Sequence, residues 1–313
     1  MPKGGGPAPD SARDRAIGAL QVAAGAAMIS FSGVFREWAA VEPTAAAFYR
    51  AAIGGLILVV IALAMRARLW AGMRRFLLMV VAAAIFTADL WLWHRSIDYV
   101  GTGLATLLTN FQVFLMAAFG ILVLRERLTW RPAVAVPMAM AGLYLIVGRE
   151  WGALSGGYRR GVWLGLLTAF TYAAYVLVLR RMQTRTDLRR KVATLAGITG
   201  LMAAMLAALS LAEGQSLRIP DVRSGAALLG YGSICHVLAW VLISLGAPKI
   251  EAQRIGLLLL VQPTLAFVWD VGLFGRAMHP PDVAGAALAL AAIYLGNTRA
   301  AGRRPERGQG SVS

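Results

Sequence analysis

The feature that most constrains this chain is a series of long apolar segments, with the charged residues confined largely to the intervals between them. A helix needs about 20 apolar residues to cross the hydrocarbon core of a bilayer, and many of these runs reach that length. Only 15% of the residues are charged, whereas a soluble domain carries roughly 25%. The chain is therefore predicted to be an all-α integral membrane protein that lies in a lipid bilayer.

Ten transmembrane helices are predicted, separated by short loops. They cover residues 16–35, 43–65, 76–95, 101–124, 132–148, 161–181, 192–212, 225–246, 252–274 and 281–298. The polar segment 1–15 is expected to be an N-terminal tail that precedes a full-length first span, and not a cleaved signal. The charged, Gly-rich segment 299–313 is expected to be a disordered C-terminal tail.

The distribution of lysine and arginine predicts the orientation of these spans. Of the 31 basic residues, 22 fall on the side of the N-terminus, 8 on the other side, and Arg50 inside a span. Because basic residues accumulate in cytoplasmic loops, both termini are predicted to be cytoplasmic in a bacterial-type inner membrane. The net charge of +16 is explained by these loops, so no nucleic-acid partner is expected.

The two halves of the chain repeat each other at a shift of 150 residues. The shift carries Gln112 onto Gln262, Tyr144 onto Tyr294, and residues 110–132 onto 260–282. Each half, 16–148 and 161–298 around a connecting loop at 149–160, holds five predicted spans, so the second half must be inverted. Inverted repeats are an architecture of secondary transporters, whose substrate sites lie near the midplane where the halves meet.

Several short motifs fit the same architecture. They are the LRERLTWRP end of the fourth span with Glu126, the following Ala141-Gly142, Phe48-Tyr49-Arg50 and Leu260-Val261-Gln262-Pro263. With the repeat, they make residues 16–298 resemble the EamA-type drug/metabolite transporters. Two positions depart from a symmetric pattern, since Val113 stands opposite Pro263 and Glu126 opposite Arg276.

This resemblance implies export or exchange of amino acids or related small metabolites, without an ATPase domain. The two five-helix halves are expected to work by alternating access. Three alternatives remain open at this point. The first is an importer or exchanger of nucleoside-like or organic-cation metabolites, the second a channel-like facilitator, and the third an intramembrane enzyme.

The charged residues Arg50 and Asp89 lie well inside predicted spans, where each is costly and needs a partner. Arg50 and Asp89 fall about 10 and 9 Å below the outer edge at 1.5 Å per residue. An intramembrane ion pair between them is the economical prediction. The pair either locks the second and third spans together or lines a cavity that receives a zwitterionic substrate.

Polar and aromatic groups at a similar depth are predicted to bind substrate. Gln112 and Gln262 are related by the repeat and lie near the midplane, although an interhelical hydrogen bond would also explain them. His236 could bind substrate, couple transport to protons, or serve as a satisfied core histidine. The remaining members of the predicted site are Tyr172, Tyr175 and Trp240.

Two further residues are expected to shape or gate the site. Pro263 removes a backbone donor after Gln262, which predicts a local helix break. Glu126, between Arg125 and Arg127, is interpreted as a structural or gating residue. No nucleotide-binding, nucleophile or zinc-binding motif is present in the sequence, and Cys235 is the single cysteine. No cofactor, metal or enzymatic activity is therefore expected.

The predicted topology can be tested with reporter fusions. Fusions at Arg185 and Gly310 should report a cytoplasmic location, and one at Gly156 a periplasmic location. One predicted span separates Gly156 from Arg185, and four separate Arg185 from Gly310. A periplasmic signal at Gly310 would contradict both the span count and the inversion of the second half.

Overall fold

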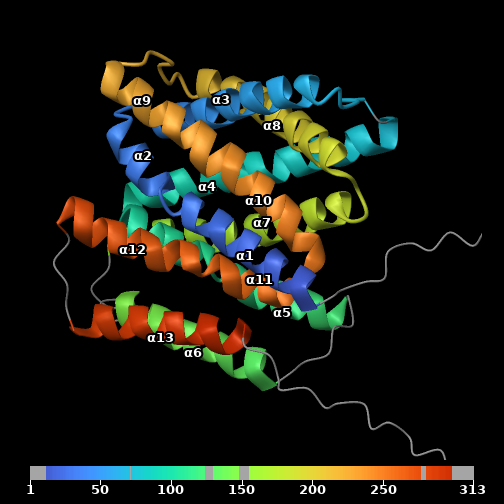
Figure 1. Cartoon of the computed structure of the whole chain (residues 1–313). Helices are drawn as coiled ribbons and strands as arrows, with labels where there is room; N and C mark the ends of the chain where they lie inside the picture. Colours follow the sequence, from blue (N-terminus) through green and yellow to red (C-terminus); the bar gives the residue numbers. More distant parts are fainter. Residues whose placement is uncertain (1–11, 71, 124–129, 148–154, 276–279, 298–313) are drawn as a thin grey trace, which may run out of the picture.

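The computed structural model describes residues 12–70, 72–123, 130–147, 155–275 and 280–297, and the regular structure within these ranges is helical (Figure 1). The first half contains α1 (Ala12–Ile29), α2 (Ser32–Trp38), α3 (Pro43–Ala64), α4 (Met73–Thr109), α5 (Gln112–Leu122) and α6 (Trp130–Val147). The second half contains α7 (Gly156–Gln183), α8 (Leu188–Ala212), α9 (Val222–Gly230), the π-helix η2 (Tyr231–Leu238), α10 (Ala239–Gly246), the 3₁₀-helix η3 (Ala247–Lys249), α11 (Ala252–Leu259), α12 (Val261–Phe274) and α13 (Pro280–Asn297).

Seven helical segments of the described chain are long and apolar enough to cross a membrane. They are Ala12–Trp38, Pro43–Ala64, Met73–Thr102, Gly156–Gln183, Leu188–Ala212, Val222–Lys249 and Arg254–Phe274. These correspond to predicted spans one, two, three, six, seven, eight and nine. The other three predicted spans coincide with shorter helices, so the membrane class is confirmed and the count of ten stays a prediction.

Several of these segments are interrupted rather than continuous. The long helix α4 contains Gly101 in the left-handed region (φ 80°), where the chain turns from the third predicted span into the fourth. A second break separates Thr109 from Gln112, and a third lies at Leu260 between α11 and α12. The breaks at 110 and 260 are separated by the same 150 residues that relate the two halves of the sequence.

The principal helix pairs each join one helix of the first half to one of the second. The most extensive pairings are α4 with α7, α6 with α13, α3 with α8, and α1 with α10. Figure 1 shows α6 and α13 side by side at one edge of the bundle. Some of these pairs depend on glycine, since a Cβ at Gly25 of α1 would lie 2.7 Å from the carbonyl oxygen of Ala239. The halves are thus interleaved, with the core between them.

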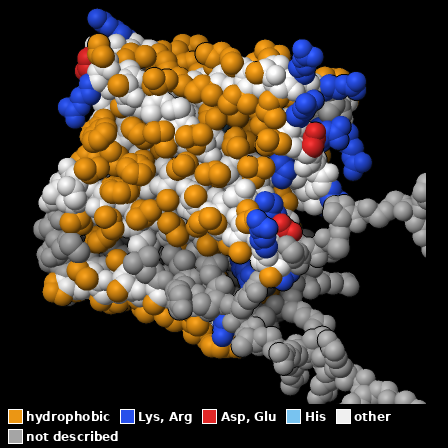
Figure 2. Space-filling view, viewed as in Figure 1, with side chains coloured by type: hydrophobic (Ala, Val, Ile, Leu, Met, Phe, Trp, Pro, Cys, Tyr) orange, Lys and Arg blue, Asp and Glu red, His pale blue; other side chains and the backbone are white. Residues whose placement is uncertain are grey.

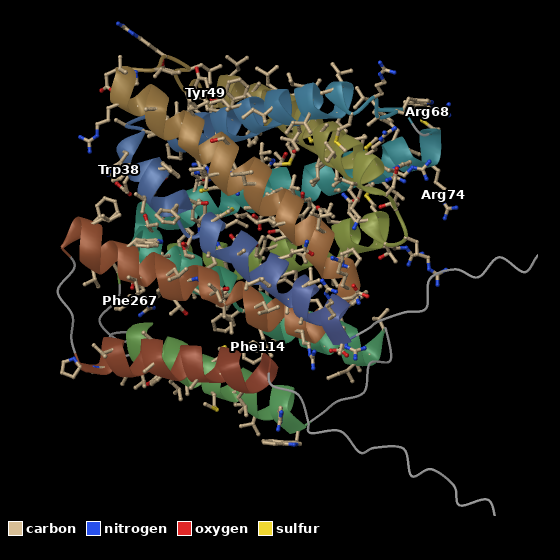
Figure 3. All side chains as sticks on the ribbon, in the orientation of Figure 1. Trp38, Tyr49, Arg68, Arg74, Phe114 and Phe267 are labelled. Atoms are coloured by element: carbon tan, nitrogen blue, oxygen red, sulfur yellow. The ribbon has the colours of Figure 1, made fainter. Side chains whose placement is uncertain are left out.

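The outer surface of the bundle is apolar over its middle and charged at its ends. Figure 2 shows hydrophobic side chains across the face, with Lys and Arg gathered at the two sides of the view. Arg68 and Arg74 lie at one end in Figure 3, whereas Trp38 and Tyr49 lie at the other. Leu56, Val60 and Leu63 of α3 are among the large exposed apolar residues. A surface of this kind suits a bilayer, because apolar side chains leave no hydrogen-bonding group unsatisfied against the lipid tails.

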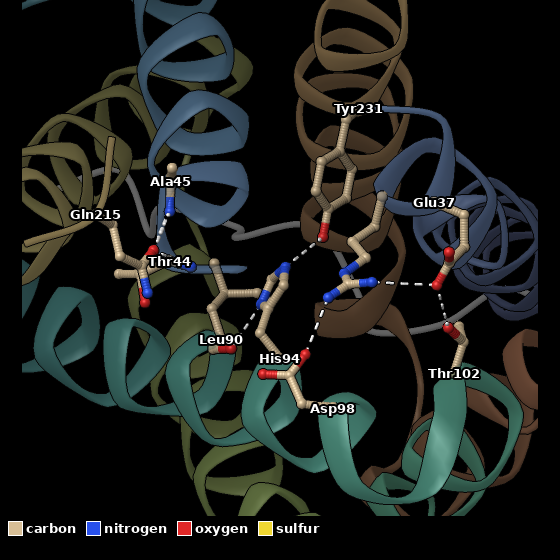
Figure 4. Close-up of polar contacts among 10 residues, drawn as sticks. Glu37, Thr44, Ala45, Leu90, His94, Asp98, Thr102, Gln215 and Tyr231 are labelled. Atoms are coloured by element: carbon tan, nitrogen blue, oxygen red, sulfur yellow. Dashed lines mark hydrogen bonds and ion pairs between the residues drawn. The ribbon is translucent and has the colours of Figure 1, made fainter. Parts of the chain in front are cut away.

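A carboxylate at the end of α8 ties three helices together. Glu213 accepts hydrogen bonds of 2.7 Å from both Trp91 Nε1 and Thr44 Oγ1, and it forms an ion pair with Arg95. The neighbouring Gln215 accepts from the backbone N–H groups of Thr44 and Ala45 (Figure 4). Burial raises the pKa of Glu213, but these hydrogen bonds and Arg95 outweigh it and hold that pKa below its usual range.

The substitution Glu213→Gln should therefore destabilise the protein by about 1.5 to 3 kcal/mol, the range for hydrogen bonds to a charged group. Because the pKa of Glu213 is lowered in the folded protein, its stabilisation is present at neutral pH and lost as pH falls through that lowered pKa. In detergent, the unfolding temperature of the variant should be lower than that of the wild type at pH 7. The difference between the two temperatures should shrink as the pH is lowered.

The matched control is Glu251→Gln, which removes an exposed pair with Arg254 at 3.0 Å. Exposed pairs of this kind contribute little, so the control should unfold close to the wild type. Equal stability of Glu213→Gln and the wild type at pH 7 would show that the network does not tie the helices.

Candidate substrate-binding site

A cavity of about 30 Å³ lies inside the bundle and is lined by both halves of the chain. It lies beside the breaks between α1 and α2, α4 and α5, and α11 and α12. Its lining residues are Ile29, Ser32, Arg50, Phe86, Asp89, Leu90, Trp93 and Thr109 from the first half, and Thr168, Tyr172, Trp240 and Gln262 from the second.

The two intramembrane charges both line this cavity, but the predicted ion pair between them is wrong. Among the described residues, no contact within 4.0 Å joins the Arg50 guanidinium to the Asp89 carboxyl. Arg50 instead donates to Tyr231 Oη at 3.3 Å and to the carbonyl oxygen of Cys235 at 3.4 Å. Asp89 Oδ1 contacts Thr171 Oγ1 at 3.0 Å. The pair does not form because the guanidinium faces η2 and the carboxyl faces α7.

The Arg50 side chain belongs to a polar chain that the sequence analysis did not anticipate. Tyr231 Oη lies 3.4 Å from His94 Nε2, and His94 Nδ1 lies 2.7 Å from the carbonyl oxygen of Leu90 (Figure 4). A carbonyl only accepts, so Nδ1 carries the hydrogen and Nε2 accepts from Tyr231. Hydrogen bonds therefore run from Arg50 through Tyr231 and neutral His94 to Leu90.

Three of the six predicted binding residues line the cavity. Tyr172 Oη donates to Gln262 Oε1 at 3.3 Å. The Tyr172 ring meets Trp240 edge-on, with 6.0 Å between the centroids. These side chains come from α7, α10 and α12, so residues far apart in sequence form one wall.

Two other predicted residues pack behind that wall. Tyr175 stacks on Phe86 at 4.0 Å and meets Trp240 edge-on at 4.8 Å. His236 Nε2 lies 2.9 Å from Thr199 Oγ1. Both side chains are buried, and neither is among the lining residues. The geometry of His236 corresponds to the core-histidine alternative.

The sixth predicted residue, Gln112, is fully buried at the start of α5. Within the described chain, neither of its amide atoms has a hydrogen-bond partner, and the same is true of Asn110 Oδ1. Three unsatisfied polar atoms thus gather at the break between α4 and α5. Asn110 was missed, although its place two residues before the repeat-related Gln112 is visible in the sequence.

The helix break that was expected at Pro263 lies before that residue, and the structural or gating role expected of Glu126 stays a prediction. The break lies at Leu260, before Gln262, and Pro263 occupies the first turn of α12. Val113 stands at the equivalent position of the first half, yet the chain also breaks there. Proline is therefore not what both breaks share. Glu126 lies outside the described residues.

The described residues contain no group of three or more His, Cys, Asp or Glu side chains placed to hold a metal ion. The features on which a function must rest are therefore the lined cavity, its two unpaired charges, and the repeat-related breaks beside it.

Comparison with known proteins matches the EamA-like transporter family over residues 16–148 and 159–298. The chain belongs to that family. The resemblance in the sequence is thereby confirmed, and the protein is a membrane transporter by family. It is also similar to the protein RarD of Streptomyces exfoliatus, with 27% identity over 253 residues, 76% of this chain and 75% of RarD.

The fold recurs in solved structures. One crystal structure, titled only as that of a protein, matches with a TM-score of 0.74 and 17% identity over 90% of this chain and 98% of the other. At this identity the likeness concerns the fold alone.

For a transporter of this family, the cavity is small. Its 30 Å³ holds about one or two water molecules, whereas pockets for small-molecule ligands measure about 300–1,000 Å³. A substrate can enter only if the surrounding helices separate.

The two glutamines should respond oppositely to replacement by leucine. Gln112→Leu removes buried polar atoms that have no partner, so it should stabilise this conformation by on the order of 1 kcal/mol. Gln262→Leu removes the acceptor of the Tyr172 hydroxyl, so it should destabilise by a similar amount. Thermal unfolding of the two variants in one detergent measures the difference, and an equal loss of stability in both would contradict the site geometry.

Proposed function

We propose that this chain is a secondary transporter that exports a small zwitterionic metabolite of the amino-acid type by alternating access. The observation that carries the proposal is the cavity itself. It presents one basic and one acidic side chain, Arg50 and Asp89, that are not paired with each other. A zwitterion carries the complementary charges, a carboxylate and an ammonium group, on one small molecule.

The contacts of Arg50 support a role in binding a carboxylate. Its two hydrogen bonds are long, at 3.3 and 3.4 Å, and both acceptors are neutral. Hydrogen bonds from a guanidinium to a carboxylate are shorter and about twice as strong. An incoming carboxylate can therefore displace these contacts. Arg50 Nε has no partner among the described residues, which leaves a further donor for a ligand.

The architecture proposed for this activity is ten spans arranged as two inverted repeats of five. The helix pairing supports it, because a twofold axis that exchanges the halves would map α3–α8 and α6–α13 onto themselves. The same operation would exchange α4–α7 with α1–α10. The breaks at 110 and 260 then form one symmetric pair beside the substrate, as in other inverted-repeat transporters.

The proposed location is the inner membrane of a bacterial cell, with both termini in the cytoplasm. The clustering of Lys and Arg on one side of the predicted spans supports this orientation. Export is then movement from the side of Arg68 and Arg74 to the side of Glu213.

A second candidate function is transport of an organic cation in the same fold. It is favoured by the aromatic side chains Phe86, Trp93 and Trp240 that line the cavity near Asp89, since aromatic faces attract cations. A channel-like facilitator would differ from both candidates, because its flux would not saturate.

Counterflow in proteoliposomes separates these candidates. Neutral amino acids should exchange with saturable kinetics, and Arg50→Gln should weaken their apparent affinity about 10- to 100-fold, which corresponds to hydrogen bonds to a charged group. An organic cation without a carboxylate should be insensitive to Arg50→Gln if it is transported at all.

The control is Arg68→Gln, at the end of the bundle and away from the cavity-lining residues, which should exchange amino acids as the wild type does. Exchange of organic cations alone, unaffected by Arg50→Gln, would replace the first candidate with the second. Flux that rises linearly with concentration would favour the facilitator.

A further inference from the structure

Two lysine side chains meet away from the central cavity, where α8 begins and η3 ends. Lys191 is the fourth residue of the spanning segment Leu188–Ala212, and Lys249 is the last residue of the segment Val222–Lys249. Both lysines therefore stand at the ends of spanning segments, which is the depth of the lipid headgroups. The elements that carry them pack together, since α8 contacts α10 and η3 contacts α1.

Lys191 is the buried member of the pair. It is 9% exposed, and its Nζ donates to the carbonyl oxygen of Ser244 on α10 at 3.0 Å. In an α-helix that carbonyl would accept from the N–H of residue 248, but residue 248 is Pro248, which has none. Lys191 therefore satisfies a carbonyl that lacks its helical donor. One of its three hydrogens serves this purpose, and its positive charge remains without a counterion.

Lys249 supplies a second ammonium group beside the first. Its Nζ donates to Gln21 Oε1 of α1 at 2.9 Å, and it lies near enough to Lys191 for the two charges to repel each other. Among the described residues, no carboxylate lies within 4.0 Å of either ammonium group. Two neighbouring cations are thus held by neutral acceptors alone.

The two carboxylates that flank these lysines in the sequence are engaged elsewhere. Glu251 forms an ion pair with Arg254 at 3.0 Å. Asp187 accepts from the backbone N–H of Arg190 at 3.2 Å. Further positive charge gathers nearby, because Arg75 of α4 donates to Thr194 Oγ1 of α8 at 2.6 Å. Partly buried charges without a counterion are costly, so an anion bound here would relieve that cost.

Exposed apolar side chains accompany the lysines. Gly18 of α1 packs on Lys249, since a Cβ there would lie 2.8 Å from the Cβ of Lys249. Its neighbours on the same helix, Ile17 and Leu20, are 38% and 70% exposed. Leu188, in the first turn of α8, is also exposed. A free anion gains nothing from such a surface, whereas the acyl chains of a lipid can lie against it.

We propose that Lys191 and Lys249 bind the phosphate group of an anionic phospholipid, whose acyl chains lie along the exposed apolar face of α1. Basic pockets between spanning helices on the cytoplasmic side bind lipid headgroups in other membrane proteins. The orientation predicted from the basic residues places this end in the cytoplasm. The site is separate from the central cavity, and it does not depend on the proposed transport activity.

Native mass spectrometry of the purified full-length protein tests the site. The protein in detergent is titrated with phosphatidylglycerol and, separately, with phosphatidylcholine of the same acyl chains, whose choline neutralises its phosphate. The wild type should bind phosphatidylglycerol more tightly. Lys249→Gln should weaken that binding about fivefold and the double variant with Lys191→Gln about 25-fold, since each lysine near an anionic headgroup contributes about a factor of five.

Two control variants separate this site from the general positive charge of the protein. Arg68→Gln removes the same charge from an exposed residue that lies with Arg74 at one end of the bundle (Figure 3). It should bind phosphatidylglycerol as the wild type does. Lys249→Arg keeps the charge and should retain most of the binding.

Equal binding of the two lipids by the wild type would overturn the proposal, and so would an equal loss in Arg68→Gln and Lys249→Gln. If the variant with Lys191→Gln does not fold, the comparison of Lys249→Gln with Arg68→Gln decides alone. Inorganic phosphate and glycerophosphoglycerol, the headgroup without acyl chains, should not displace the lipid at millimolar concentration. Displacement by either would show a site for free phosphate groups and overturn the assignment to a lipid.

Discussion

The structure depends on the cost of unsatisfied polar groups in hydrocarbon. A backbone N–H or C=O group without a partner is expensive there, so spanning segments are helical and can break only where protein or water covers the break. The breaks at Ser30–Phe31, Asn110–Phe111 and Leu260 all lie beside the central cavity. The same constraint places Arg50 and Asp89 on the cavity wall, because neither side chain could face lipid.

The segments that form helices could be predicted from the sequence, because span length and charge placement are one-dimensional properties. The wall built from Tyr172, Trp240 and Gln262 was also predictable from depth. The partner of Arg50 could not be predicted, because the depth of a residue in the membrane does not give the direction of its side chain around the helix axis. The guanidinium turns toward Tyr231 and Cys235. The break at Asn110 could not be predicted either, because no proline or glycine marks the interruption.

The local departures from regular structure concentrate around the cavity. The π-helix η2 carries Tyr231 and His236, and π-helical turns are frequent at functional sites because they re-aim side chains. Trp269 Nε1 donates to Ser30 Oγ at the first break, and its ring stacks on Phe31 at 4.4 Å. Contacts of this kind join half-helices of opposite repeats. In the proposed alternating access, exchange of these contacts between two arrangements would open the cavity to one side at a time.

The central claim is that a zwitterion bound inside this bundle is held between Arg50 and Asp89. An experimental structure of the protein with a transported amino acid bound tests it most directly. The account predicts density in an enlarged version of the described cavity, with the carboxylate on the Arg50 guanidinium and the ammonium group on Asp89. Density for the substrate away from both side chains, or an Arg50–Asp89 ion pair with the substrate bound elsewhere, would contradict it.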